Sequence, residues 1–125
     1  MSNLTPRKDS ACRLACINIV SADPKRLADF YGHVLGANIC EDHGGPHRIE
    51  IRFGENNGGT CIVVNYQEGF VPQKVNVCHG FELRVADADA EYKRIRDLGI
   101  EIQEPPRNLP WGYRFFHIED PDGNG

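Results

Sequence analysis

The stretch VSADPKRLADFYGHVLG, residues 20–36, decides the fold, because residues 85–99, VADADAEYKRIRDLG, repeat its plan. In the first copy Asp23 is placed to cap a helix, and Pro24 stands at the first helical position, where its missing N–H costs nothing. Both copies end on Leu-Gly, and glycine is common just past a helix C-terminus. The sequence therefore predicts two copies of one structural unit.

Each predicted helix carries an apolar stripe. In the first helix the stripe has the spacing i, i+3, i+4, i+7 and i+8, and consists of Leu27, Phe30, Tyr31, Val34 and Leu35. The second helix begins after a cap at Asp87 or Asp89, and its stripe consists of Ala88, Tyr92, Ile95 and Leu98. Each helix is expected to pack one face against a sheet.

Strand patterns surround both helices. Around the first helix they cover residues 11–20, 38–42, 48–53 and 60–66. Around the second helix they cover residues 81–85, 100–103 and 113–119. The first copy is therefore predicted as strand, helix and three strands, and the second as strand, helix and two strands.

The sequence closes on FFHIEDPDGNG, residues 115–125. Residues 120–123, Asp-Pro-Asp-Gly, have the composition of a type I turn, which normally leads into a returning strand. Only Asn124 and Gly125 follow the turn. We therefore expect the second copy to lack its last strand, or another segment to pair with the edge left open.

The composition indicates one ordinary globular domain. The chain has 125 residues, 40% hydrophobic and 26% charged, with a formal net charge of -4 that gives no reason to expect nucleic acid as a partner. It has no apolar run of about 18 residues, so we expect no membrane span and a cytoplasmic location. Its cysteines form no C-x-x-C pair, so small buried thiols are favoured over disulfides or structural zinc; they are Cys12, Cys16, Cys40, Cys61 and Cys78.

The order of these motifs resembles the vicinal oxygen chelate superfamily, which contains glyoxalase I, bleomycin-resistance proteins, fosfomycin-resistance enzymes and extradiol dioxygenases. The resemblance is carried by V-S-A-D, F-Y and L-G in the first copy, by V-A-D-A-D-A and L-G in the second, and by W-G-Y-R and D-P-D-G-N near the end. It implies an α+β fold of two βαβββ modules around a shared cleft, the second module without its last strand. The expected organisation is a flexible tail at residues 1–10 and one domain at residues 11–125, with modules at about 11–68 and 77–125.

In metal-dependent members of this superfamily, His and Glu side chains in the cleft hold a divalent ion. The resemblance places Cys16, Val63 and Gly80 at three of the ligand positions, and a fourth ligand, a Glu, on the strand expected after residue 125. None of the three is a family ligand, so no metal site is predicted. His79 is a weak candidate, because strand alternation puts it on the opposite face from Gly80. His43 and His47 lie in a Gly-rich turn, where metal binding is also disfavoured.

The same alternation predicts which side chains line the cleft: Cys16, Asn18, Val63, Asn65, Gly80, Glu82 and Arg84, with Trp111 at the mouth. Glu82 and Arg84 are two charges on a face expected to be buried, so they must meet a ligand, pair with each other or lie at a dimer seam. Trp111 either stacks on a ligand or covers the core beneath its loop.

Three functions fit this pattern. The first is a metal-free protein that binds a small organic molecule, as bleomycin-resistance proteins do. The second is a metal-dependent lyase or dioxygenase that uses nickel, zinc, manganese or iron and has its last ligand beyond Gly125. The third is a structural or interaction module without a ligand. Whether the chain catalyses a reaction is left open, and we expect a homodimer.

Overall fold

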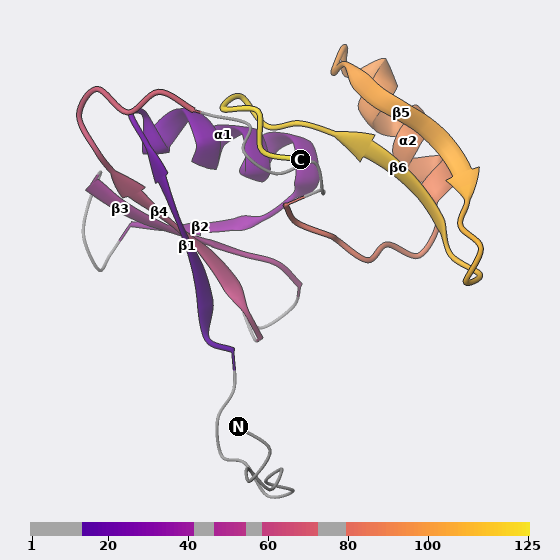
Figure 1. Ribbon diagram of the computed structural model, residues 1–125, viewed down its shortest axis with the longest axis horizontal. Helices are drawn as coiled ribbons and strands as arrows, with labels where there is room; N and C mark the ends of the chain where they lie inside the picture. Colours follow the sequence, from indigo (N-terminus) through magenta and orange to yellow (C-terminus); the bar gives the residue numbers. More distant parts are fainter. Residues whose placement is uncertain (1–13, 42–46, 55–58, 73–79) are drawn as a thin grey trace, which may run out of the picture.

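The computed structural model describes residues 14–41, 47–54, 59–72 and 80–125 (Figure 1). The first half of the chain contains β1 (Cys16–Ser21), α1 (Pro24–Leu35), β2 (Asn38–Cys40), β3 (Arg48–Arg52) and β4 (Cys61–Tyr66). The second half contains α2 (Ala88–Asp97), β5 (Ile102–Asn108) and β6 (Arg114–Ile118). Each half thus has a helix followed by strands, which confirms the predicted α+β class.

The two helices begin at the caps that the sequence predicts. The Asp23 carboxylate accepts a 3.1 Å hydrogen bond from the backbone N–H of Arg26, in the first turn of α1. The Asp87 carboxylate accepts a 3.1 Å bond from the N–H of Ala90, so Asp87, rather than Asp89, caps α2. Within the described residues, no helix is both long and apolar enough to span a membrane.

The first half forms a four-stranded sheet in the order β1-β4-β3-β2. β4 lies in the middle, parallel to β1 and antiparallel to β3. α1 packs against one face of this sheet, and the buried cluster between them consists of Leu27, Tyr31, Ile51, Ile62 and Val64. By strand alternation, the neighbours of these strand residues point to the face opposite α1.

The second half is a two-stranded antiparallel sheet of β5 and β6 with α2 beside it (Figure 1). The rings of Tyr92 on α2 and Phe116 on β6 meet edge to face, with centroids 5.7 Å apart. Ile95 on α2 is fully buried. The second half therefore has its own small apolar core.

Within the described part of the chain, polar contacts at α1 join the two halves. The Tyr31 hydroxyl on α1 donates a buried 2.9 Å hydrogen bond to the Asp120 carboxylate, which follows β6. The Arg94 guanidinium on α2 donates a 2.8 Å bond to the carbonyl of Val34 at the end of α1. The end of the chain is therefore fastened against α1.

The prediction of a strand at residues 81–85 is wrong in one respect. The segment has no ladder partner among the described residues, although β1, its counterpart in the first half, pairs with β4. A single backbone hydrogen bond, 2.9 Å from the N–H of Phe81 to the carbonyl of Gly125, marks where a ladder would start. A strand forms by hydrogen bonding to a neighbouring strand, and the sequence pattern of residues 81–85 does not show whether such a neighbour is present.

β5 is longer than predicted, because it runs through a proline pair that reads as a loop. It covers Ile102–Asn108 rather than residues 100–103, and it includes Pro105 and Pro106. Its pairing with β6 has two register shifts, between Ile102 and Arg107. Among the described strands β5 pairs with β6 alone, so prolines lacking an N–H are tolerated on its other side.

Candidate functional site

Four of the predicted cleft residues lie together on the face of the first sheet opposite α1. Asn18 on β1 is in register with Val63 on β4, and Cys16 lies one pleat away. The Asn65 amide donates a 3.1 Å hydrogen bond to the Asn18 side-chain oxygen, and the Asn18 amide lies 3.6 Å from the Cys16 sulfur. These contacts fix the two amides relative to each other.

The same face also carries a charged cluster from β3, which was not among the predicted cleft residues. Glu50 is in register with Val63, and Arg48 with Asn65. Glu50 is only 6% exposed, and its two carboxylate oxygens accept hydrogen bonds of 2.9 Å from Arg48 and 2.6 Å from Arg52. We call this cluster the Arg-Glu-Arg triad.

The signal for the triad was present in the sequence. Ile49 and Ile51 alternate with the three charged residues, so apolar packing of the isoleucines against α1 forces the charges to the opposite face. Alternation of this kind indicates both a strand and the face on which its polar side chains lie. We call the face formed by the triad together with Cys16, Asn18, Val63 and Asn65 the open face.

The triad gives the open face a defined electrostatic character. Hydrogen bonds from Arg52 and then Arg48 hold the pKa of Glu50 below its usual value, so the carboxylate is ionised at neutral pH. Within the triad two guanidinium groups share one carboxylate, so these three side chains sum to one positive charge. Guanidinium groups bind carboxylate and phosphate oxygens well, so this arrangement can hold the anionic group of a small molecule.

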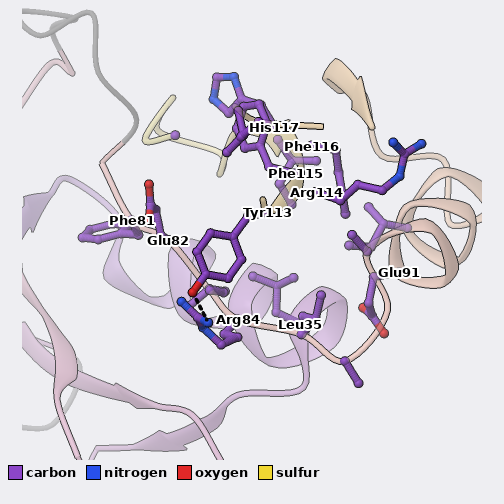
Figure 2. A pocket seen from close by; sticks show the side chains of 18 of the residues that line it. Leu35, Phe81, Glu82, Arg84, Glu91, Tyr113, Arg114, Phe115, Phe116 and His117 are labelled. Carbon is purple, nitrogen blue, oxygen red and sulfur yellow. Dashed lines mark hydrogen bonds between the residues drawn. The ribbon is translucent and has the colours of Figure 1, made fainter. Parts of the chain in front are cut away.

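The other predicted cleft residues lie elsewhere. Glu82 and Arg84 line a pocket of about 550 Å³ between the second half of the chain and α1 (Figure 2). Trp111 lines the same pocket. Gly80 immediately precedes Phe81, which also lines this pocket. A Cβ built on Gly80 would lie 3.3 Å from the carbonyl oxygen of Gly125. Within one chain, the eight predicted residues therefore form two groups rather than one cleft.

Arg84 reaches across the pocket to the residue that precedes β6. Its guanidinium donates a 3.1 Å hydrogen bond to the Tyr113 hydroxyl and lies 4.7 Å from the centre of that ring (Figure 2). This hydrogen bond lowers the pKa of Tyr113 below its usual value and raises that of Arg84. Tyr113 thus contacts the Arg84 guanidinium through both its hydroxyl and its ring.

The exposure of three predicted cleft residues bears on the environments expected for them. Glu82 and Arg84 are both exposed in the single chain, so burial by a ligand or at a dimer seam stays a prediction for them. Trp111 is 69% exposed, which contradicts the alternative in which it covers the core beneath its loop. An exposed indole remains accessible for stacking on another molecule.

Two chain segments contribute consecutive lining residues to the pocket. Residues 81–86 form one side and β6 the other, while Phe30 and Leu35 of α1 and Ile95 of α2 contribute apolar surface. In the first half the corresponding place, between β1 and β3, is occupied by β4. The pocket thus has the position of a strand.

The residues at three of the expected ligand positions do not suit the divalent metal ion that metal-dependent members of the superfamily bind. Val63 offers a buried isopropyl group, Gly80 offers no side chain, and the Cys16 thiol lies against Asn18. Among the described ranges, no three His, Cys, Asp or Glu residues lie close enough together to hold an ion. His43, Cys78 and His79 lie outside these ranges, and the ring of His47 packs against Tyr66 at 5.1 Å.

The sequence matches both a protein-family model and a bacterial relative. A family model described as Glyoxalase/Bleomycin resistance protein/Dioxygenase superfamily matches residues 13–125. The uncharacterized protein YwbC of Bacillus subtilis strain 168 is 30% identical over 118 residues, which cover 90% of this chain and 93% of YwbC. The match extends through both halves of the molecule.

Two solved structures with the same fold are similar to this chain over most of its length. TnmS3, an antibiotic binding protein from Streptomyces sp. CB03234, is 25% identical, with a TM-score of 0.67 and 93% of each chain covered. A glyoxalase/bleomycin resistance protein/dioxygenase superfamily member from Sphaerobacter thermophilus DSM 20745 has a TM-score of 0.69 at 24% identity, covering 90% of this chain and 92% of that one. The second likeness concerns the fold alone.

Proposed function

The chain belongs to the Glyoxalase/Bleomycin resistance protein/Dioxygenase superfamily, and from this premise we propose that it binds a small organic molecule with an anionic group on the open face. The anionic group would contact Arg48 and Arg52, whose side chains are 38% and 31% exposed, and the rest of the molecule would lie near the exposed Asn18. The antibiotic-binding neighbour TnmS3 supports a binding role of this kind on the same fold.

The observation that carries the proposal is the Arg-Glu-Arg triad. A buried carboxylate between two partly exposed arginines contributes little net stability, because its desolvation offsets the attraction, and apolar residues of similar size often serve stability as well. Glu50 is nevertheless 6% exposed in the middle of the sheet, with both oxygens engaged. We infer that the triad serves to present a fixed positive charge to a ligand.

A ligand-observed NMR screen tests this function. We expect aromatic carboxylates to bind and the matching uncharged amides to bind more weakly. Arg48→Ala should weaken carboxylate binding by about tenfold or more, since a charge-assisted hydrogen bond is worth roughly 1.5–3 kcal/mol. Arg96→Ala, at an exposed arginine on α2, serves as the matched control. Equal binding of acids and amides, or equal losses in both variants, would refute the proposal.

We further propose that a second copy completes the cleft and contributes Gly80, Glu82, Arg84 and Trp111. All four are predicted cleft residues that lie away from the open face of their own chain, and Glu82, Arg84 and Trp111 are exposed. Light scattering should report a dimer. Mixing Arg48→Ala with Arg84→Ala chains should restore about a quarter of the sites, because in a mixed pair one site keeps both arginines. A monomer, or no restoration, would contradict this arrangement.

A metal-dependent lyase or dioxygenase is the competing function within the same superfamily. Elemental analysis of the purified protein, followed by addition of nickel, zinc, manganese or iron(II), separates the two. One metal ion per chain would displace our proposal. A flat response to both ligands and metals would instead favour a structural or interaction module.

We also propose a cytoplasmic location. Three described cysteines, Cys16, Cys40 and Cys61, carry free thiols, which a reducing compartment preserves. Fractionation of cells that express the protein, with a thiol-alkylation assay on each fraction, checks the location.

A further inference from the structure

We propose that Cys16 on β1 and Cys61 on β4 form a site of reversible oxidation, at which a peroxide converts the two thiols into a disulfide that joins the strands. Both cysteines carry free thiols in the structure. The reaction requires no ligand on the open face, so it does not depend on the proposed function.

The two cysteines are neighbours across the parallel pair of β1 and β4. They are partners in its register, and Cys61 lies two residues before Val63, so both side chains belong to the open face. Neighbouring strands lie about 4.7–4.9 Å apart, and the Cα atoms of disulfide-bonded cysteines lie about 4.4–6.8 Å apart. The sheet therefore holds Cys16 and Cys61 at a separation that a disulfide can span.

The side chain of Cys61 also leans toward β1. Its sulfur lies 3.9 Å from the carbonyl oxygen of Ala15, the residue before Cys16, and the Cys61 N–H donates a 3.3 Å hydrogen bond to the same oxygen. The Cys16 sulfur lies 3.6 Å from the Asn18 amide nitrogen, on its own strand. Rotation about the Cα–Cβ bonds, with the strand pairing unchanged, would bring the two sulfurs together.

The third described cysteine is too far away to compete for Cys61. Cys40 on β2 is in register with Glu50, and β3 separates β2 from β4. Two strand spacings amount to about 9.5 Å between Cα atoms, whereas a disulfide reaches no further than about 7 Å. Among the described cysteines, the order of the strands therefore selects Cys16 and Cys61 as the pair.

The two thiols differ in their access to solvent, which sets the order of the steps. Cys16 is partly exposed, whereas Cys61 is 3% exposed. The Cys16 thiolate attacks hydrogen peroxide, so that an S–O bond forms, the O–O bond breaks and a water leaves. The Cys61 sulfur then attacks the sulfur of this sulfenic acid, so that an S–S bond replaces the S–O bond and a second water leaves. Two thiols and one hydrogen peroxide thus give one disulfide and two waters.

Arg52 assists the second step. The pKa of Arg52 is raised first by its hydrogen bond to Glu50 and then by its electrostatic interaction with Cys61. The guanidinium therefore lies close enough to Cys61 to attract the negative charge of the attacking sulfur. Buried thiols in apolar surroundings are usually inert, so this cation distinguishes Cys61 from a purely structural cysteine.

Peptide mapping of the oxidised protein tests the pair. Trypsin cuts the chain so that each of its five cysteines lies in a separate peptide, with Cys16 in residues 14–25 and Cys61 in residues 53–74. After the reduced protein is treated with hydrogen peroxide, the disulfide between these two peptides should exceed every other pair by about tenfold or more, and dithiothreitol should remove it. In urea, where the sheet no longer holds the cysteines together, this preference should disappear. A different dominant pair, an unchanged preference in urea or the absence of a disulfide would overturn the proposal.

Single variants test the order of the steps. In Cys61→Ser the sulfenic acid on Cys16 has no partner thiol, so labelling of Cys16 by dimedone should rise by about fivefold or more over the parent. In Cys16→Ser the buried Cys61 should stay largely unlabelled. Cys40→Ser is the matched control and should form the disulfide like the parent.

Circular dichroism checks that each variant is folded, and Cys61→Ala takes the place of Cys61→Ser if the hydroxyl disrupts the buried position. Equal labelling of the remaining cysteine in Cys16→Ser and in the Cys61 variant would contradict the proposed order. Loss of the disulfide in Cys40→Ser would contradict the proposed pair.

Discussion

The hydroxyl of Tyr31 lies 2.9 Å from a carboxylate oxygen of Asp120, and both residues are buried although 89 positions separate them. Asp120 also accepts bonds of 2.9 Å from the N–H of Asp122, 3.0 Å from the N–H of Asn124 and 2.8 Å from its side-chain amide. One carboxylate therefore closes the terminal Asp-Pro-Asp-Gly-Asn turn and fastens it to α1. The motif that marks the family in the sequence acts here as a structural clamp.

Removing the Tyr31 hydroxyl should loosen this clamp. Tyr31→Phe keeps the ring in the core but takes one donor from the buried Asp120, which should lower the free energy of unfolding by about 1–3 kcal/mol. Urea denaturation measures the change. Tyr66→Phe, at a tyrosine that is 41% exposed, is the control and should stay within about 0.5 kcal/mol of the parent. A Tyr31→Phe protein as stable as the parent would show that the contact is dispensable.

The same contact predicts a loss of stability at high pH. Burial, followed by the charge of Asp120, raises the pKa of Tyr31 well above its ordinary value of 10.0. Above that pH the unfolded chain ionises this tyrosine while the folded protein keeps it protonated, so the free energy of unfolding falls as the pH rises. Denaturation at pH 9 and pH 11 should show a smaller decrease for Tyr31→Phe than for the parent. Equal decreases would mean that Tyr31 is not the group responsible.

Two glycines around α1 should respond to alanine in opposite ways. Gly36, which follows α1, has φ 71°, so Gly36→Ala forces a strained backbone and should cost about 1 kcal/mol. Gly32 lies inside α1, where an added Cβ would stand 3.4 Å from a carbon of Ile39. Gly32→Ala should therefore be neutral or stabilise by up to about 1 kcal/mol through helix propensity. Thermal denaturation distinguishes them, and destabilisation by both would indicate that the Ile39 contact is too close.

Local signals explain why both helices could be predicted from the sequence. Caps, apolar spacing and the terminal glycine all lie within one segment, so α1 and α2 were placed to within two residues. Strand pairing depends on distant segments, and the parallel contact of β1 with β4 follows from no local pattern. For the same reason a strand was expected at residues 81–85, where the described structure has no ladder partner.

The candidate site could be predicted only in part. Alternation placed Cys16, Asn18, Val63 and Asn65 on one face, and hydrogen bonds and register join them there. Alternation could not show that Glu82 and Arg84 lie away from this face in the folded chain. The placement of one half against the other is set by distant contacts, such as that between Tyr31 and Asp120. The sequence shows three charged residues on β3, but it does not show that Glu50 lies in register with Val63, which places the charges on this face.

The Arg-Glu-Arg triad allows the requirements of stability to be separated from those of binding. Glu50→Leu alone leaves two guanidinium groups without their shared carboxylate and should cost about 1–3 kcal/mol, a range reduced by the partial exposure of the arginines. Replacing all three by apolar residues, Arg48→Met, Glu50→Leu and Arg52→Met, should restore the stability to within about 1 kcal/mol of the parent or raise it. Guanidinium chloride denaturation measures both variants.

If the triad serves a ligand, the stable triple variant should still lose binding of aromatic carboxylates while keeping its fold by circular dichroism. The low pKa of Glu50 adds a second readout, because its ionised form favours folding above the usual glutamate range and this contribution is lost as the pH falls. The parent should therefore lose more stability between pH 6 and pH 3 than the triple variant. A triple variant that binds carboxylates like the parent would remove the open face from consideration as the anion site, whereas one that is strongly destabilised would make the triad a structural element.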